Sequence, residues 1–375
     1  MEYRILHRAY FSALIVMVVS LSPNGFSSDE ETTILEPAIR PARITASEPF
    51  ADTFSFQKAV NYLDNAALDW QQRKQCVTCH TNGLYLVSGA EMSTRGKAYE
   101  SIRDYSLNYL KRYVVDKVPP DGDSGAVQGI VSTTAFLAIS DVKTKGKLDP
   151  VTAKAFDYVW THQNEEGYWH EWLKCNWPPF EVDNHFGVTL MAYALGMAPE
   201  EFTQTARAQD GMRKLRKYLN NHPPENVHQK AMLLLTSTTF EGILGPDAQQ
   251  AVVDELFTLQ KPDGGWNLIE MGRWNRSDGK EKDIASSDGY ATGFATYALL
   301  KAGIDTHDSR IQKAITWLKV NQRTSGRWYT RSPRQDRKHY ISNAGTSYAV
   351  LALSASGELL KLFEDRLEGV KNIND

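Results

Sequence analysis

The sequence predicts an all-α protein whose helices pair into hairpins, with about five to six hairpins arranged as a ring. The first observation is a short motif, Gln-x-x-x-Gly-x-Trp, which occurs at residues 163–169, 260–266 and 322–328. The second is that each copy ends an amphipathic stretch and is followed, after a loop, by an apolar stretch rich in alanine. A motif that recurs with the same flanks indicates a repeated structural unit.

The spacing of the units supports this interpretation. The apolar stretches align on an Ala-Leu pair, 104 and 54 residues apart, at Ala194-Leu195, Ala298-Leu299 and Ala352-Leu353. Because the first gap is about twice the second, a degenerate copy should lie inside it, and residues 212–236 fit that place. An earlier unit ends near Ser140, and the first unit begins at Phe56.

Each part of the motif has a structural role in this interpretation. Glycine supplies an unusual backbone geometry, tryptophan covers the end of a helix pair, and glutamine helps to fasten the turn. Helices of small residues pack closely, so we expect the alanine-rich helices to form the inner layer of the ring. The amphipathic helices, with charges along one face, should form the outer layer.

These repeats resemble the QW motifs of squalene-hopene and oxidosqualene cyclases. The resemblance covers residues 56–357 and implies an α/α toroid, the fold that these cyclases share with the β subunits of protein prenyltransferases. We therefore place one squalene-cyclase-like toroid at residues 55–358. The cyclases carry two such domains, whereas this chain has room for one, and they lack the Cys-x-x-Cys-His sequence found here at residues 76–80.

The N-terminus has the pattern of a secretory signal. Basic residues precede an apolar run at residues 11–21, and small residues follow near Ser27. The run is shorter than the ~20 apolar residues of a membrane span, so we expect cleavage and a periplasmic or secreted protein with no stable span afterwards. Residues 28–54 should form a disordered or extended linker, and residues 359–375 a C-terminal helix or tail.

Composition limits the function further. The chain has 375 residues and a formal net charge of -3, so its charge balance indicates no nucleic-acid partner. It has only three cysteines, which excludes a small scaffold held by several disulfides.

Two of those cysteines form the sequence Cys76-Val77-Thr78-Cys79-His80. In a c-type haem site the two thiols add to the porphyrin vinyl groups, and the histidine is the proximal iron ligand. We therefore predict one covalently attached haem c, whose iron is held by His80. A redox dithiol would favour a βαβ context, and the flanks look helical. A zinc site would need a second Cys/His pair, which Cys175 alone does not supply.

The sixth iron ligand is a separate question. Met92 is the nearest methionine downstream of His80, and it is one candidate. A histidine, water or an empty position remain alternatives.

The cyclases protonate their substrate with an Asp-x-Asp-Asp segment at the start of an inner helix. This chain has Glu181-Val182-Asp183-Asn184-His185 at the matching place, and the resemblance implies that Asp183 is the proton donor. Glu181, Asp183 and His185 together could keep one carboxyl protonated through like-charge proximity and burial. The alternative is a solvated acidic turn.

The repeat register assigns helix caps near that segment. Adding 104 and then 54 residues to Asn184 leads to Asp288 and Ser342, and all three are strong N-cap types. We therefore expect Asn184 to be a cap, and we do not expect capping to explain Asp183.

The same register predicts that the inner helices all begin at one mouth of the ring. Their positive dipole ends favour an anionic ligand there. Two of the loops that lead into those helices are also basic, with arginines and lysines at residues 273–282 and 331–338. A third loop carries aromatic residues between Tyr168 and Phe180, which suit an apolar ligand or sugar rings.

Three hypotheses for function follow. The first is an enzyme that acts on an isoprenoid or similar lipid-like substrate, with Asp183 as general acid and haem adding redox chemistry. The second is a non-enzymatic electron-transfer or binding module, in which the toroid binds a redox partner protein or an anionic polymer. The third is a carbohydrate-active enzyme such as a polysaccharide lyase, for which Tyr290 or Tyr340 could serve as the base.

Overall fold

The computed structural model describes residues 39–92, 95–119, 125–170 and 177–359. The chain divides into residues 1–37 and residues 38–375, and the second unit contains every described helix. The predicted signal peptide at residues 1–27 and nearly all of the predicted tail at residues 359–375 lie outside the described residues.

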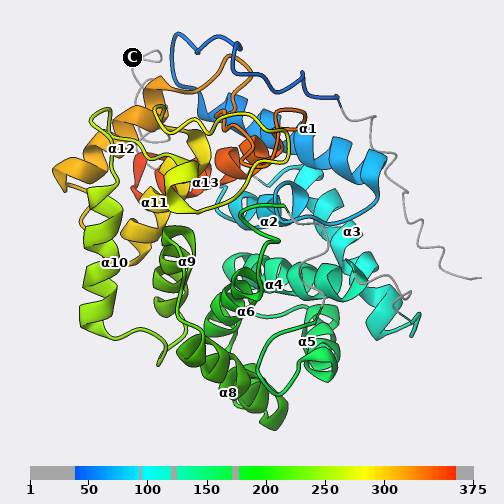
Figure 1. Ribbon diagram of the computed structural model, residues 1–375. Helices are drawn as coiled ribbons and strands as arrows, with labels where there is room; N and C mark the ends of the chain where they lie inside the picture. Colours follow the sequence, from blue (N-terminus) through cyan, green and yellow to red (C-terminus); the bar gives the residue numbers. More distant parts are fainter. Residues whose placement is uncertain (1–38, 93–94, 120–124, 171–176, 360–375) are drawn as a thin grey trace, which may run out of the picture. The chain divides into compact units, whose positions relative to one another are not determined.

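The described chain consists of six helical hairpins in sequence order (Figure 1). The first helices of the hairpins are α1 (Phe56–Lys74), α3 (Lys97–Val114), α5 (Pro150–His162), α8 (Ala206–Asn221), α10 (Pro246–Thr258) and α12 (Ser309–Val320). The second helices are α2 (Asn82–Ala90), α4 (Gly125–Lys145), α6 (Asn184–Met197), α9 (Val227–Ser237), α11 (Gly289–Lys301) and α13 (Ile341–Ala355). Two short helices, α7 (Glu200–Thr203) and the 3-10 helix η1 (Leu268–Met271), lie in connections.

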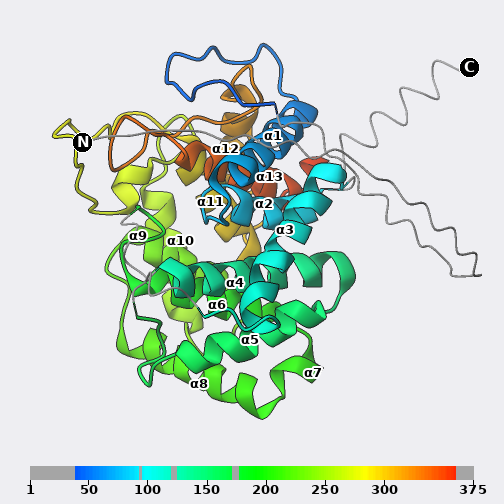
Figure 2. The same cartoon turned by 90° about the vertical axis from the view of Figure 1, so that its right-hand side faces the viewer.

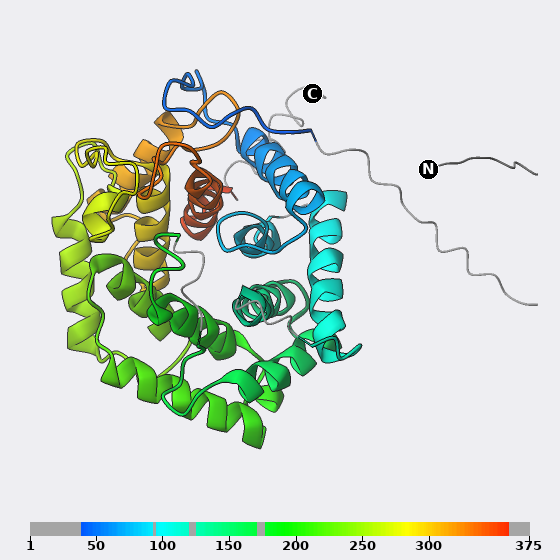
Figure 3. The same cartoon turned by 45° about the vertical axis from the view of Figure 1, so that its right-hand side comes forward.

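The second helices form a closed inner ring. Each contacts the next in the order α2, α4, α6, α9, α11 and α13, and α13 contacts α2 again. Figure 3 shows these helices inside a layer formed by the first helices of the hairpins. The fold is therefore an α/α toroid of six hairpins, in agreement with the sequence prediction.

Burial explains which helix of each hairpin lies inside. All nine residues of α2 are buried, whereas α8 buries six of its 16 residues along one face. Small residues let the inner helices approach closely, since a Cβ on Gly293 of α11 would lie 2.6 Å from the Ala349 nitrogen of α13. A helix that is apolar on all sides is stable only when it is surrounded, and the ring surrounds it.

The helix α4 also has the length and apolar composition to cross a membrane, and it is the one such helix within the described ranges. We expected no such segment beyond the N-terminal signal. In the ring, 72% of its most apolar window is buried against other helices, and core helices of soluble proteins have the same composition.

The three tryptophans of the repeated motif have the same contacts. Their indole Nε1 atoms donate to backbone carbonyls ten residues earlier, over 3.0 Å for Trp169, 2.6 Å for Trp266 and 2.7 Å for Trp328. All three side chains are almost completely buried. Each tryptophan thus fastens the loop to the outer helix before it.

The three glutamines join neighbouring hairpins. Each Nε2 donates to the carbonyl of the motif glycine and to a backbone carbonyl at the next outer helix. For Gln163 and Gln260 the second acceptor lies in α8 and α12. For Gln322 it is the Ser55 carbonyl at 3.0 Å, and Gln322 Oε1 accepts from the Ser55 backbone N–H at 2.8 Å. The last motif therefore joins the last hairpin to the first.

The segment before α1 strengthens this closure. Residues 39–54 contain no helix and run along the outside of the last motif (Figure 2). Glu48 forms an ion pair with Arg327, whose side chain is 1% exposed, and Phe50 lies under the Arg323 guanidinium. This part of the predicted linker is extended and packed against the ring.

The motif glycines lie where two hairpins approach. Gly326 has φ +96°, and a Cβ there would lie 2.2 Å from the Lys58 carbonyl oxygen of α1. Gly303 has a similar φ of +91°, but a Cβ there would have no other atom within 4 Å. A side chain at either position would strain the backbone, but only one at Gly326 would also clash with the neighbouring hairpin.

We expect Gly326→Ala to lower the free energy of unfolding by about 1–3 kcal/mol more than Gly303→Ala, because only the first substitution also forces α1 away. Urea denaturation of both variants beside the wild type measures the difference. Equal losses would mean that Gly326 does not hold the first and last hairpins together.

Candidate functional site

The mouth of the ring is the face at which the inner helices begin. Every inner helix follows a loop from the end of its outer partner, so all six start on the same side. The Cys76–His80 segment forms the first of these loops, between α1 and α2. The Glu181–His185 segment forms the third, at the start of α6.

The Cys76–His80 turn is held by one buried side chain. Asn82, in the first position of α2, is fully buried, and its Oδ1 accepts from the Thr78 backbone N–H at 2.9 Å. Its Nδ2 donates to the Cys76 carbonyl, also at 2.9 Å. These two bonds fix the backbone between the two thiols.

His80 is enclosed by aromatic rings. Its side chain stacks on Tyr340 at 5.5 Å between ring centroids and meets the Trp70 ring edge-on at 4.7 Å. Burial lowers the pKa of His80 to about 3, so the imidazole is neutral at physiological pH. A neutral imidazole is the form that binds a metal.

A hydrogen-bonded chain orients the His80 ring. His80 Nδ1 lies 2.8 Å from Thr81 Oγ1, which accepts from Asn343 Nδ2 at 3.0 Å. Asn343 Oδ1 in turn accepts from the Tyr62 hydroxyl at 2.6 Å. Outer contacts of this kind fix the ring orientation of a ligating histidine and leave Nε2 for the metal.

The two cysteines differ in exposure. Cys76 is half-buried, and burial raises the pKa of its thiol. Cys79 is 3% exposed and lines a cavity at the centre of the ring. Neither thiol is in a disulfide. Among the described residues, no group of three or more His, Cys, Asp or Glu side chains is placed to hold a metal ion.

Met92 lies far from His80. His80 precedes the N-terminus of α2 and Met92 follows its C-terminus, so the nine-residue helix separates them by about 13 Å. Met92 as the sixth ligand stays a prediction, with α2 lying between two residues that are close in sequence.

Asp183 is the N-cap of α6, which corrects the sequence expectation that Asn184 fills this role. Its Oδ1 accepts from the backbone N–H groups of His185 at 2.9 Å and Phe186 at 3.3 Å. The register is shifted by one residue here, because Asn184 is already helical. The expected cap Asp288 is confirmed, whereas Ser342 is the second residue of α13 and instead bonds Thr330.

The second oxygen of Asp183 is also engaged. Gln229, near the start of α9, donates from Nε2 to Asp183 Oδ2 at 2.6 Å. Burial raises the pKa of Asp183, and the Gln229 and backbone hydrogen bonds act in the opposite direction. The structure thus gives Asp183 a structural role, and its role as a proton donor stays a prediction.

His185 has an unusual environment. It is 3% exposed, and neither ring nitrogen has a hydrogen-bond partner among the described residues. Burial lowers its pKa to about 4. A buried histidine without partners is uncommon, and here it is kept neutral by its surroundings.

Sequence reasoning did not find His228, which lies beside this group. Its Nε2 is 2.8 Å from the hydroxyl of Tyr290, and both side chains are buried. Burial lowers the pKa of His228 to about 3. One feature of the sequence could have pointed to His228. It is the second residue of the inner helix α9, as His185 is of α6.

The two predicted sites face one another at the mouth. Burial is the main reason why the pKa of the Cys76 thiol is raised, and the negative charge of Glu181 adds a smaller increase. Cys79 and Phe180 line the same central cavity. That cavity is apolar and measures about 30 Å³, which is room for one or two water molecules.

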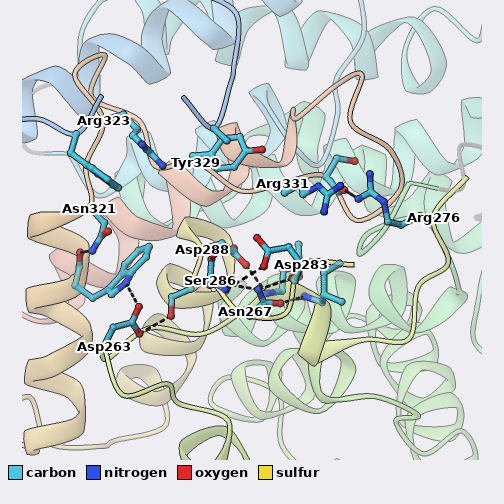
Figure 4. Close-up of a pocket in the computed structure, with 17 residues that line it drawn as sticks. Asp263, Asn267, Arg276, Asp283, Ser286, Asp288, Asn321, Arg323, Tyr329 and Arg331 are labelled. Carbon is cyan, nitrogen blue, oxygen red and sulfur yellow. Dashed lines mark hydrogen bonds between the residues drawn. The ribbon is translucent and has the colours of Figure 1, made fainter. Parts of the chain in front are cut away.

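The basic loops are neutralised in part. Asp336 forms ion pairs with Arg276, Lys280 and Arg331, and Asp278 forms another with Arg276. These contacts tie the loop before α11 to the loop before α13. A pocket of about 440 Å³ beside them has arginine and aspartate side chains in its wall (Figure 4).

Comparison with known proteins identifies the fold. No protein-family model matches the chain, and no curated protein matches it. Among solved structures, a glycosidase variant is similar at 9% identity and a TM-score of 0.50, over 81% of this chain and 99% of that chain. At this identity the likeness shows the fold alone.

Two terpene cyclases are also similar. The type II terpene cyclase MstE from Scytonema matches at 13% identity and a TM-score of 0.44, over 81% of this chain and 99% of that one. The ent-copalyl diphosphate synthase from Streptomyces platensis matches at 16% identity and a TM-score of 0.43, over 80% of this chain and 51% of that one. This chain therefore spans about half the length of the synthase.

Capping by Asp183 can be measured without knowledge of the reaction. We expect Asp183→Ala to lower the free energy of unfolding by about 1 kcal/mol and Asp183→Asn by less than half of that, because asparagine also caps helices. Urea denaturation of the two variants tests this. Equal losses would contradict the capping role.

The neutral state of His185 predicts a pH dependence. An unfolded histidine titrates near pH 6.5 and the folded one near pH 4, so the unfolded state binds more protons between these values. His185 therefore contributes stability fully above pH 6.5 and loses it as the pH falls.

Between pH 7 and pH 5 we expect wild type to lose about 2 kcal/mol more of its unfolding free energy than His185→Leu, which has no imidazole to protonate. Urea denaturation at the two pH values measures both losses. Parallel losses in the two proteins would show that His185 titrates normally.

Proposed function

We propose that this chain is an exported c-type haem protein in which the toroid holds one haem at the mouth and serves as a one-electron carrier. The haem is attached through Cys76 and Cys79, and His80 is its proximal iron ligand. The observation that carries the proposal is the Cys76–His80 turn itself, which combines two thiols outside any disulfide with a neutral, oriented imidazole.

The surrounding residues suit this cofactor. Asn82 fixes the spacing of the two thiols by bonding the backbone of the turn. Thr81 and Asn343 set the orientation of the His80 ring, so that Nε2 is the nitrogen available to iron. Trp70 and Tyr340 keep water from the imidazole. The donor set therefore fits a c-type haem.

A haem bound here supplies a one-electron couple, whose potential depends on burial, axial ligands and nearby charges. The rigid toroid contributes by keeping His80 neutral and its environment dry. The sixth ligand remains open to Met92, a histidine, water or no ligand. The redox partner would be a protein in the compartment to which residues 1–27 direct the chain.

The other two hypotheses have less support in the described residues. Acid-catalysed cyclisation of an isoprenoid would need a free carboxyl, whereas Asp183 caps α6 and accepts from Gln229. For a polysaccharide lyase, Tyr290 is buried against His228 and Tyr340 packs on His80. Neither tyrosine is presented as an accessible base.

The test is a pyridine haemochrome spectrum of protein exported from a host that matures cytochromes c. We expect a covalent c-type band at about one haem per chain, retained in Met92→Leu because Met92 lies beyond α2. The band should be lost in Cys76→Ser/Cys79→Ser.

His80→Ala should change the visible spectrum of the haem, since the proximal ligand is removed. A wild-type protein without covalent haem, after export with maturation, would overturn the proposed function. A spectral change in Met92→Leu as large as that in His80→Ala would instead restore Met92 as a ligand.

A further inference from the structure

A basic cleft of about 370 Å³ opens beside His80. It lies between α1, the loop before α13 and the segment before α1. Its aromatic residues include Trp70 and Tyr340, the two rings that cover His80. Asn343, which holds Thr81 against His80, lines the same cleft. The cleft is thus continuous with the surroundings of the proposed iron ligand.

The charge of the cleft is strongly one-sided. Five permanent cations line it, namely Arg40, Arg43, Arg73, Arg337 and Lys338. The only carboxylate in its lining is Asp69, which bonds Arg73 at 2.6 Å. Within the described parts of the chain, no ion pair involves the other four cations.

This excess contrasts with the neighbouring part of the same loop. Arg331 pairs with Asp336, as do Arg276 and Lys280 from the loop before α11. Arg337 and Lys338 follow Asp336 directly in the sequence and line the cleft without such a partner. Among the described residues, Arg331 before Asp336 is therefore paired, whereas Arg337 and Lys338 after it have no ion pair.

Unpaired arginines and aromatic rings in one cleft suit a planar ligand that carries carboxylates. Guanidinium groups bind carboxylates through paired hydrogen bonds, and aromatic rings pack against a flat apolar body. A haem has this combination, with a flat porphyrin and two propionate groups on one edge. The cleft shares Trp70 and Tyr340 with the surroundings of His80, so a haem on the Cys76–His80 turn would lie next to it.

We propose that this cleft binds the carboxylates of the haem attached at Cys76 and Cys79 through its cations, which include Arg43 and Arg337. The inference rests on the proposed function, because it needs a haem on the Cys76–His80 turn. It goes further in assigning a propionate site to residues outside the attachment motif. A free dicarboxylate has the same chemistry and is the competing occupant.

The test compares two double variants of the haem-loaded protein. Arg43→Gln/Arg337→Gln removes two exposed cations of the cleft. Arg95→Gln/Arg273→Gln removes two exposed arginines that do not line it, with the same change in net charge. Redox titration of the haem from about pH 5 to pH 9 is recorded for wild type and both variants, a range that brackets propionate titration.

We expect the cleft variant to have a lower reduction potential at neutral pH, because fewer positive charges oppose the ferric state. The pH at which the potential begins to fall should move up by about one unit, since propionates without arginine partners hold their protons more tightly. The control variant should follow wild type. Identical curves for the cleft and control variants would overturn the inference.

A succinate titration of the holoprotein separates the two occupants. If the propionates fill the cleft, succinate should not bind to the wild-type holoprotein. Binding that is abolished in Arg43→Gln/Arg337→Gln would assign the cleft to a free dicarboxylate and overturn the haem-carboxylate site. A failure of the proposed function is distinguishable, because wild type would then carry no covalent haem for the redox titration.

Discussion

Closure of the ring is the constraint on which the other features depend. Inner helices that are apolar on all sides, such as α2, are stable only if both neighbours in the layer are present. A row of hairpins would leave its first and last members without a neighbour on one side. The hydrogen bonds between Gln322 and Ser55 join these two hairpins to each other. The first hairpin, which carries the Cys76–His80 turn, is therefore completed by the last one. Tyr340 and Asn343 reach His80 only because α13 lies next to α2.

The same topology concentrates chemistry at one face. In a ring of hairpins all inner helices run in the same direction, so every loop that precedes one reaches the mouth. The loops that meet there are held by contacts with one another and with the helix ends. Asp183 and Asp288 cap helices, and Asp336 joins two loops, so these carboxylates are used to hold the mouth together. This explains why Asp183, which looks catalytic in the sequence, has mainly structural contacts.

The sequence was sufficient where the signal was local and repeated. Three copies of one motif predicted the ring, its two layers and the roles of Gly326 and Trp328. The predicted cap of α6 was wrong by one residue, because Asp183 and Asn184 are both residue types that cap helices. Only the structure shows that Asp183 is the cap and that it also accepts from Gln229. The sequence failed for contacts between distant segments. No local pattern places His228 on Tyr290 or separates Met92 from His80 by the length of a helix.

The location of the turn between the first and last hairpins also bears on its function. A flexible loop would let water reach His80, and the imidazole would then titrate near its ordinary pKa and compete for protons. Burial instead lowers that pKa to about 3. Keeping the imidazole neutral requires Trp70 from α1 and Tyr340 from the loop before α13, two segments that meet only in the closed ring. A large toroid around a single small motif is understandable in these terms, since its closure supplies the dry, oriented environment that the short motif alone could not.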